Sequence, residues 1–81
     1  ARFDSKIDIR GMRYEEATKV VEEFVDQAIL ADVSNLRILH GKGNGSLRDA
    51  VKRKLREYRM EMEVYHPPAE QGGDGVTLVN M

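Results

Sequence analysis

The sequence predicts a small α/β (α+β) two-layer sandwich in which two helices cover one face of a small mixed sheet. Segments at both ends of the chain alternate apolar and polar residues with the period of two that half-buried strands show. Two longer segments instead repeat their apolar residues every three or four positions, as amphipathic helices do. Along the 81 residues these segments give the order βαβαββ. A chain of this length forms a single domain, residues 1–81.

The first predicted strand covers residues 6–10, where Ile7 and Ile9 alternate with polar neighbours, and Gly11 ends it. The first helix is expected near residues 13–31, because one apolar stripe runs through this segment. The stripe comprises Tyr14, Ala17, Val21, Phe24 and Ala28. A turn-rich break over residues 32–35 separates the helix from the second strand, residues 36–40.

The second helix is expected near residues 46–58, with Ser46 as its N-cap and Asp49 completing a capping box. Its apolar face comprises Leu47, Ala50, Val51, Leu55 and Tyr58. Residues 60–65 and 76–79 are the last two predicted strands. Between them, a segment with two prolines and three glycines predicts a mobile surface loop. Right-handed crossovers make the first three strands parallel, and the last is expected to pair antiparallel to its neighbour.

Composition narrows the class of protein. The chain has no cysteine, which excludes disulfides and thiolate metal sites and suits a cytoplasmic protein. No apolar run approaches the roughly 20 residues of a membrane span, so no membrane partner is expected. Because the chain begins with Ala1, we expect it to be a fragment of a larger chain.

The charges are divided along the chain. The net charge of −1 argues against a strongly basic nucleic-acid module. Acidic residues gather over positions 15–26, however, and basic residues gather over positions 42–59. One face of a near-neutral domain can therefore be basic. The alternative is two ordinary solvated helix faces.

The most informative segment is the glycine-rich turn of residues 40–48, which joins the second strand to the second helix. Its alternating glycines, Gly43 and Gly45 among them, let the backbone turn sharply with its N–H groups outward. The following helix adds the positive end of its dipole, so the turn predicts a phosphate-binding site. The cations expected there are Lys42, Arg48 and, from the start of the first helix, Arg13. A plain strand-to-helix turn remains the alternative.

Three segments together resemble the Smr domain, the small MutS-related module. Residues 7–12, Ile-Asp-Ile-Arg-Gly-Met, are similar to its N-terminal Leu-Asp-Leu-(His or Arg)-Gly signature. Residues 40–48 are similar to its His-Gly-x-Gly motif, and residues 72–79 resemble its C-terminal Gly-rich strand. Arg10 and Lys42 make the chain most like the C-terminal domain of the bacterial second-type MutS proteins.

The resemblance implies a fold like the C-terminal domain of a bacterial translation initiation factor. It also implies a parent chain with a MutS-like, ATP-binding core that forms a homodimer. The implied function is nucleic-acid binding with a nicking endonuclease activity, in suppression of recombination. The alternative is a non-catalytic module that binds DNA, RNA or the ribosome during rescue of collided ribosomes.

The predicted catalytic residues are Asp8, Arg10 and His40, because parallel strands bring their carboxyl ends to one edge of the sheet. Asp8 is expected to orient a water or hold a divalent metal, and His40 to act as general acid or base. Arg10 and Lys42 are expected to stabilise charge on the phosphoryl oxygens. No other cofactor is evident in the domain.

Arg10 stands where many family members have His, and arginine cannot shuttle protons near neutral pH. The alternative is that Asp8 and His40 only anchor the glycine turn. Tyr65 and His66 could stack on a base, although a surface tyrosine at a strand end more often has no functional role.

Overall fold

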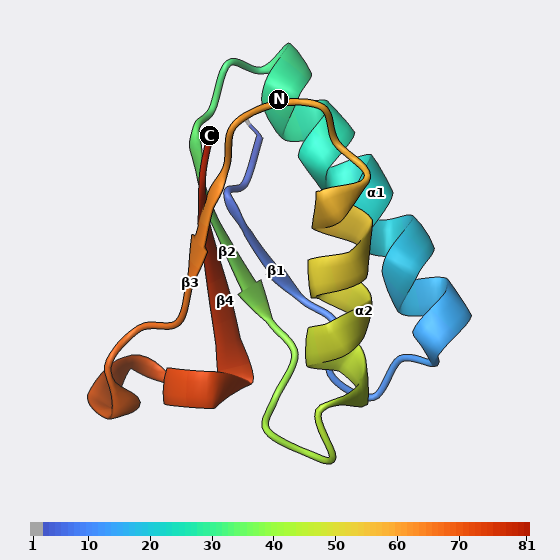
Figure 1. Cartoon of the computed structure of the whole chain (residues 1–81), viewed down its shortest axis with the longest axis vertical. Helices are drawn as coiled ribbons and strands as arrows, with labels where there is room; N and C mark the ends of the chain where they lie inside the picture. Colours follow the sequence, from blue (N-terminus) through green and yellow to red (C-terminus); the bar gives the residue numbers. More distant parts are fainter. Residues whose placement is uncertain (1–2) are drawn as a thin grey trace.

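A computed structural model describes residues 3–81 and shows two layers, a four-stranded sheet and two helices that cover one of its faces (Figure 1). The strands are β1 (Lys6–Asp8), β2 (Asn35–Leu39), β3 (Glu63–Tyr65) and β4 (Val76–Asn80). The helices are α1 (Tyr14–Leu30) and α2 (Ser46–Arg56). The predicted fold class and element order are confirmed.

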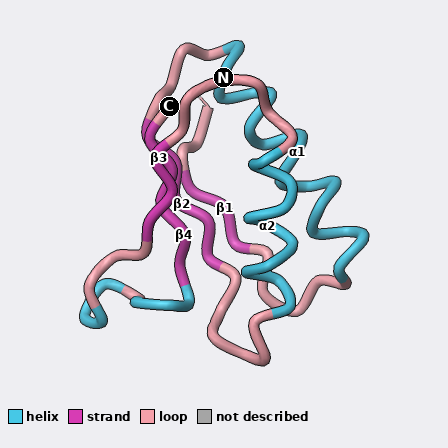
Figure 2. Tube along the Cα trace, in the orientation of Figure 1, coloured by secondary structure: helices cyan, strands magenta, loops and turns pink. Residues whose placement is uncertain are grey.

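The strands lie in the order β1-β2-β4-β3 (Figure 2). β1 pairs parallel to β2, whereas β4 pairs antiparallel to both β2 and β3. β1, β2 and β3 therefore run in one direction, as predicted, and their carboxyl ends lie at the same edge of the sheet. The sequence did not reveal that the last strand of the chain is inserted between β2 and β3.

The core lies between the sheet and the helices. All but one of the buried residues of α1 and α2 belong to the predicted apolar faces, and the exception is Val25. They are Ala17, Val21, Phe24, Val25, Ala28, Ala50, Val51 and Leu55. They meet Ile9, Leu36, Ile38 and Val79 of the sheet layer. The Tyr58 hydroxyl ties the end of the α2 region to α1 by donating to Asp26 Oδ1 over 2.8 Å. This packing fixes α2, and with it the turn that precedes α2.

The start of α2 differs from the prediction. Gly45, with φ of 85°, is the N-cap, and Ser46 is the first helical residue. The side chain of Asn44 accepts a hydrogen bond from the Ser46 N–H over 3.0 Å. The prediction of Ser46 as N-cap is wrong, because the Asn44 amide already satisfies a donor of the first turn. α2 also ends earlier than expected, at Arg56.

The segment between β3 and β4, predicted as a mobile loop, is organised by two short 3₁₀ helices, η1 (Ala69–Gln71) and η2 (Gly73–Gly75). It lies against the sheet face away from the helices (Figure 1). There the Arg37 guanidinium donates to the Gln71 carbonyl over 2.7 Å. At the start of the segment His66 Nδ1 donates to the Val76 carbonyl over 2.7 Å, and the centre of its ring lies 6.5 Å from that of the His40 ring. The segment is thus attached to the sheet. No helix in residues 3–81 has the length and apolar character needed to span a membrane.

Candidate nucleic-acid interface

The carboxyl ends of three strands form one edge of the sheet. Asp8 ends β1, His40 follows β2, and His66 follows β3. The glycine turn leaves the middle of this edge and leads into α2 (Figure 1). Ligands of open α/β sheets bind outside the carboxyl ends of the strands, which makes this edge the candidate site.

Asp8 and Arg10 form a bidentate ion pair at the edge. Arg10 Nη2 lies 2.8 Å from Asp8 Oδ2, and Arg10 Nε lies 3.0 Å from Asp8 Oδ1. Oδ1 also accepts the Arg10 backbone N–H over 3.0 Å. These hydrogen bonds hold the pKa of Asp8 below its usual range, so the carboxylate is ionised at neutral pH. Both side chains remain open to solvent, at 49% exposure for Asp8 and 61% for Arg10.

The Arg10 side chain lies against Gly41 of the turn. A Cβ at position 41 would lie 3.4 Å from Arg10 Cγ. The first strand and the glycine turn therefore touch through this arginine. Its Nη1 has no hydrogen bond within residues 3–81, so it can still receive an anion while Nε and Nη2 bind Asp8.

His40 is a buried residue with 4% exposure. Its Nδ1 lies 2.9 Å from the Gly41 carbonyl, so that nitrogen must donate. Its Nε2 lies 2.8 Å from Thr77 Oγ1 and therefore accepts from the hydroxyl. Burial lowers the pKa of His40, and the positive charges of Arg48 and Lys52 lower it further. The imidazole is neutral at pH 7, and both of its nitrogens are engaged by the protein.

Asp8 and His40 point to opposite faces of the sheet. Asp8 pairs with Leu39 across the parallel ladder, and paired residues share a face. His40 follows Leu39 and turns to the other face, towards the helices, where Ile38 is also buried. The structure therefore brings Asp8 together with Arg10 and Gly41, but it separates Asp8 from His40.

The glycine turn uses several of its backbone N–H donors internally. The N–H groups of His40 and Gly41 donate to the Gly75 carbonyl over 3.0 and 2.9 Å, and the Gly45 N–H donates to the Lys42 carbonyl over 3.2 Å. In the described part of the chain, the N–H groups of Lys42, Gly43 and Asn44 have no such partner. The predicted phosphate-binding site thus keeps three consecutive backbone donors, those of Lys42, Gly43 and Asn44. Gly45 instead stabilises the conformation of the turn.

Two of the three predicted cations, Lys42 and Arg48, lie at this turn. Lys42 projects from the turn and is exposed, and Arg13 is exposed just before α1. The half-buried Arg48 lies over Gly45, since a Cβ there would come within 2.9 Å of Arg48 Nη2. A side chain at position 45 is also disfavoured by the positive φ of this residue.

Gly75 is a site residue that the sequence did not single out. Its carbonyl accepts the two N–H groups of the turn, and a Cβ there would lie 3.4 Å from the Gly41 backbone. The run Gly72-Gly73-Asp74-Gly75 was the available signal. Residues 3–81 contain no group of three or more His, Asp or Glu side chains arranged to hold a metal. A metal at Asp8 would have to displace Arg10, so these residues are a poor fit for a resident ion.

The fold defines a small α/β domain with a mixed four-stranded sheet. A glycine turn and an Asp8–Arg10 pair lie at the carboxyl edge of this sheet. The family model of the Smr domain matches residues 7–81, and the chain belongs to that family. It is 43% identical over 75 residues to Endonuclease MutS2 of Listeria welshimeri, and 40% identical over 77 residues to that of Streptococcus thermophilus. These matches cover 93% and 95% of the chain, which spans only 10% of the length of either relative.

Solved structures agree with this membership. The Smr domain of Thermus thermophilus MutS2 superposes with a TM-score of 0.87 at 36% identity, covering 95% of this chain and 96% of that one. YdaL, a stand-alone small MutS-related protein from Escherichia coli, superposes with a TM-score of 0.81 at 27% identity. That match covers 95% of this chain and 63% of YdaL.

Proposed function

We propose that this domain binds nucleic acid at the carboxyl edge of its sheet and hydrolyses a phosphodiester there. The observation that carries the proposal is the exposed Asp8–Arg10 pair beside Gly41, with Lys42 on the adjoining turn. The relatives named Endonuclease MutS2 support the activity, since this Smr-family chain is 43% identical to the matched tenth of one of them.

The residues have separable roles in this proposal. Arg10 binds one phosphoryl oxygen through its free Nη1 while it holds Asp8 in place. The ionised Asp8 accepts a proton from the water that attacks phosphorus. The new P–O bond replaces the P–O bond to one sugar, and that leaving oxygen takes its proton from solvent water. Lys42 and the N–H groups of residues 42–44 neutralise the charge that develops on the phosphoryl oxygens. His40 acts as a positioning residue that holds Gly41 through its carbonyl.

One specific observation favours the second candidate, a non-catalytic module that grips DNA, RNA or the ribosome. His40 is buried and Asp8 is already paired with Arg10, so no unpaired acid or base among the predicted residues faces solvent. The cations and the turn are unaffected by this difficulty, because binding a phosphate needs no proton transfer. Rescue of collided ribosomes belongs to this second candidate.

The parent protein extends the proposal beyond these residues. We assign it an ATP-binding, MutS-like core, assembly as a homodimer, a cytoplasmic location and a role in suppression of recombination. The length of the relatives, ten times that of the matched segment, leaves room for such a core.

Cleavage assays on this domain decide between the two candidates. Supercoiled DNA and a structured RNA are incubated with wild type, Asp8→Asn and the matched control Glu23→Gln, a carboxylate exposed on α1, with and without Mg²⁺ or Mn²⁺. We expect Asp8→Asn to lose about 10² or more in rate and the control to lose nothing. If purified wild type cleaves neither substrate under any condition, catalysis fails and the binding module stands.

A further inference from the structure

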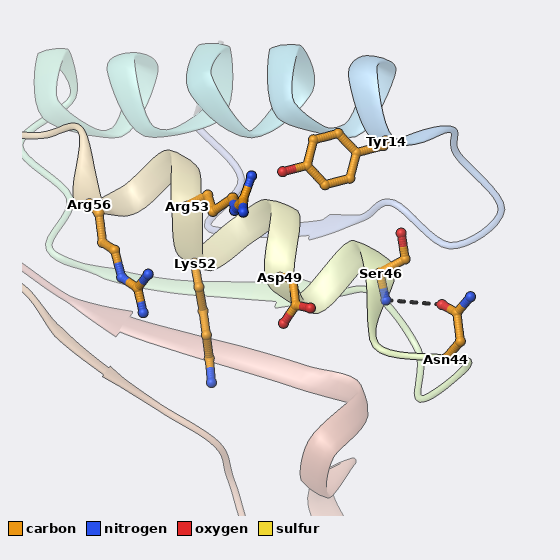
Figure 3. A pocket seen from close by; sticks show the side chains of 7 residues that line it. All are labelled: Tyr14, Asn44, Ser46, Asp49, Lys52, Arg53 and Arg56. Atoms are coloured by element: carbon orange, nitrogen blue, oxygen red, sulfur yellow. Dashed lines mark hydrogen bonds between the residues drawn. The ribbon is translucent and has the colours of Figure 1, made fainter.

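A groove of about 620 Å³ lies over the outer surface of α2 and starts at the glycine turn (Figure 3). At the turn end it is lined by Asn44 and Ser46, and along the helix by Asp49, Lys52, Arg53 and Arg56. Tyr14, the first residue of α1, lines it from the neighbouring helix. The groove is thus continuous with the candidate site but uses different side chains.

The cations of this groove carry no ion pair in the described residues. Lys54, on the same helix, pairs with Glu22 of α1 at 3.6 Å and with Glu57 at 3.1 Å. Within residues 3–81, Lys52, Arg53 and Arg56 have no carboxylate within 4.0 Å. α2 therefore uses one cation to bind α1 and leaves three without an ion pair, of which Arg53 and Arg56 are exposed and Lys52 is half-buried. This charge favours an anionic partner.

The cations flank the helix on two sides. Figure 3 shows Arg53 on the side of α2 nearer α1, whereas Lys52 and Arg56 extend from the other side. Lys52 and Arg56 are four residues apart, about one helical turn. A polyanion lying along α2 can meet charges from both sides, whereas one small anion cannot reach all three.

Tyr14 and Asp49 show which polyanion fits. Tyr14 is 37% exposed, and its ring lies beside α2 at the end of the groove near Ser46. A tyrosine face stacks on a base only when that base is unpaired and accessible. The Asp49 carboxylate repels a phosphate but accepts a hydrogen bond from an N–H group on the exposed edge of an unpaired base.

From these positions we infer that a single-stranded segment of nucleic acid runs from the glycine turn along α2, with a base on Tyr14 and its phosphates beside Arg53 on the α1 side and beside Lys52 and Arg56 on the other side. The inference rests on the proposed nucleic-acid binding. It adds a substrate class, single strands, and the path of the strand along α2. DNA and RNA share this chemistry of bases and phosphates.

Binding of fluorescein-labelled dT15, U15 and a 15-base-pair duplex to the 81-residue chain tests the inference. We expect Tyr14→Leu to weaken single-strand binding about tenfold and to leave duplex binding unchanged. Lys52→Ala and Arg56→Ala should each reduce the slope of log K against log salt by about 0.7 for single strands. The matched control is Lys19→Ala, which removes the same charge from an exposed position of α1.

The outcomes separate the inference from the function on which it rests. Loss by the groove variants but not by Lys19→Ala, with either dT15 or U15, supports the strand path. If Lys42→Ala weakens binding while the groove variants behave like Lys19→Ala, the strand path is wrong and the edge site stands. If wild type binds none of the three probes, the proposed function itself is wrong.

Discussion

Two positions at one strand edge show how differently neighbouring polar residues can be used. Asp8 and Arg10 satisfy each other in solvent, at 49% and 61% exposure. His40, one residue beyond the partner of Asp8 in the ladder, is buried and satisfied by Thr77 and Gly41. The exposed pair can exchange its contacts for those of a ligand at little cost, whereas any exchange at His40 would leave buried polar groups unsatisfied. We call Asp8 and Arg10 the binding corner of the edge, and His40 with Thr77 and Gly41 the supporting corner.

The largest expected effect is on the supporting corner. His40→Ala should lower the free energy of unfolding by about 3 kcal/mol, because it leaves a cavity and leaves the buried Thr77 hydroxyl without its hydrogen-bond partner. Urea denaturation measures the change. If His40→Ala unfolds at the same urea concentration as wild type, the contrast between the corners is lost.

The next effect concerns the turn between the corners. Gly45→Ala and Gly11→Ala both force alanine to a φ of 80° or more, which costs about 1–2 kcal/mol. Only at position 45 does the new Cβ meet Arg48, at 2.9 Å, since nothing lies within 4 Å of one at position 11. We therefore expect the two variants to lose similar stability, measured by urea, whereas Gly45→Ala alone loses nucleic-acid affinity. If Gly45→Ala and Gly11→Ala bind nucleic acid with equal affinity, Arg48 is not part of the binding surface.

A pH dependence of stability just below neutral pH should follow from His40. Burial lowers its pKa below that of the unfolded chain, so the unfolded state binds a proton first as pH falls. The contribution to stability is complete above about pH 6.5 and is lost as pH falls from there through the folded pKa. Its slope cannot exceed about 1.4 kcal/mol per pH unit, the value for one proton. An NMR titration of the His40 ring should give a midpoint below 6.5, and a midpoint above it would contradict the burial argument.

The smallest expected effect is on the stability of the binding corner. Asp8→Asn should leave the urea midpoint of unfolding unchanged, because exposed ion pairs contribute little to folding. The same variant should lose cleavage or binding at the edge. A marked loss of stability would mean that the Asp8–Arg10 pair supports the turn instead of meeting a ligand.

Much of this domain was predictable from local patterns. The apolar stripes gave both helices, since burial of residues such as Val21 and Val51 follows the helical period. The edge itself followed from parallel β1 and β2. The separation of Asp8 from His40 was not predicted, although the alternation of each strand contains it. Asp8 is next to buried Ile9, whereas His40 lies two residues after buried Ile38 and so shares its face. The role of Gly75 was hidden, because it acts through a backbone carbonyl more than 30 residues away from the turn.

The central place of β4 also governs when the site can form. The strand that joins β2 to β3 is the last of the four along the chain, and the residue just before it, Gly75, fixes the N–H groups of His40 and Gly41. During synthesis the glycine turn emerges well before the segment that shapes it. Contacts of such long sequence separation slow folding, because loop closure precedes their gain. The edge should acquire its ligand-binding geometry late, in the same cooperative step that completes the sheet.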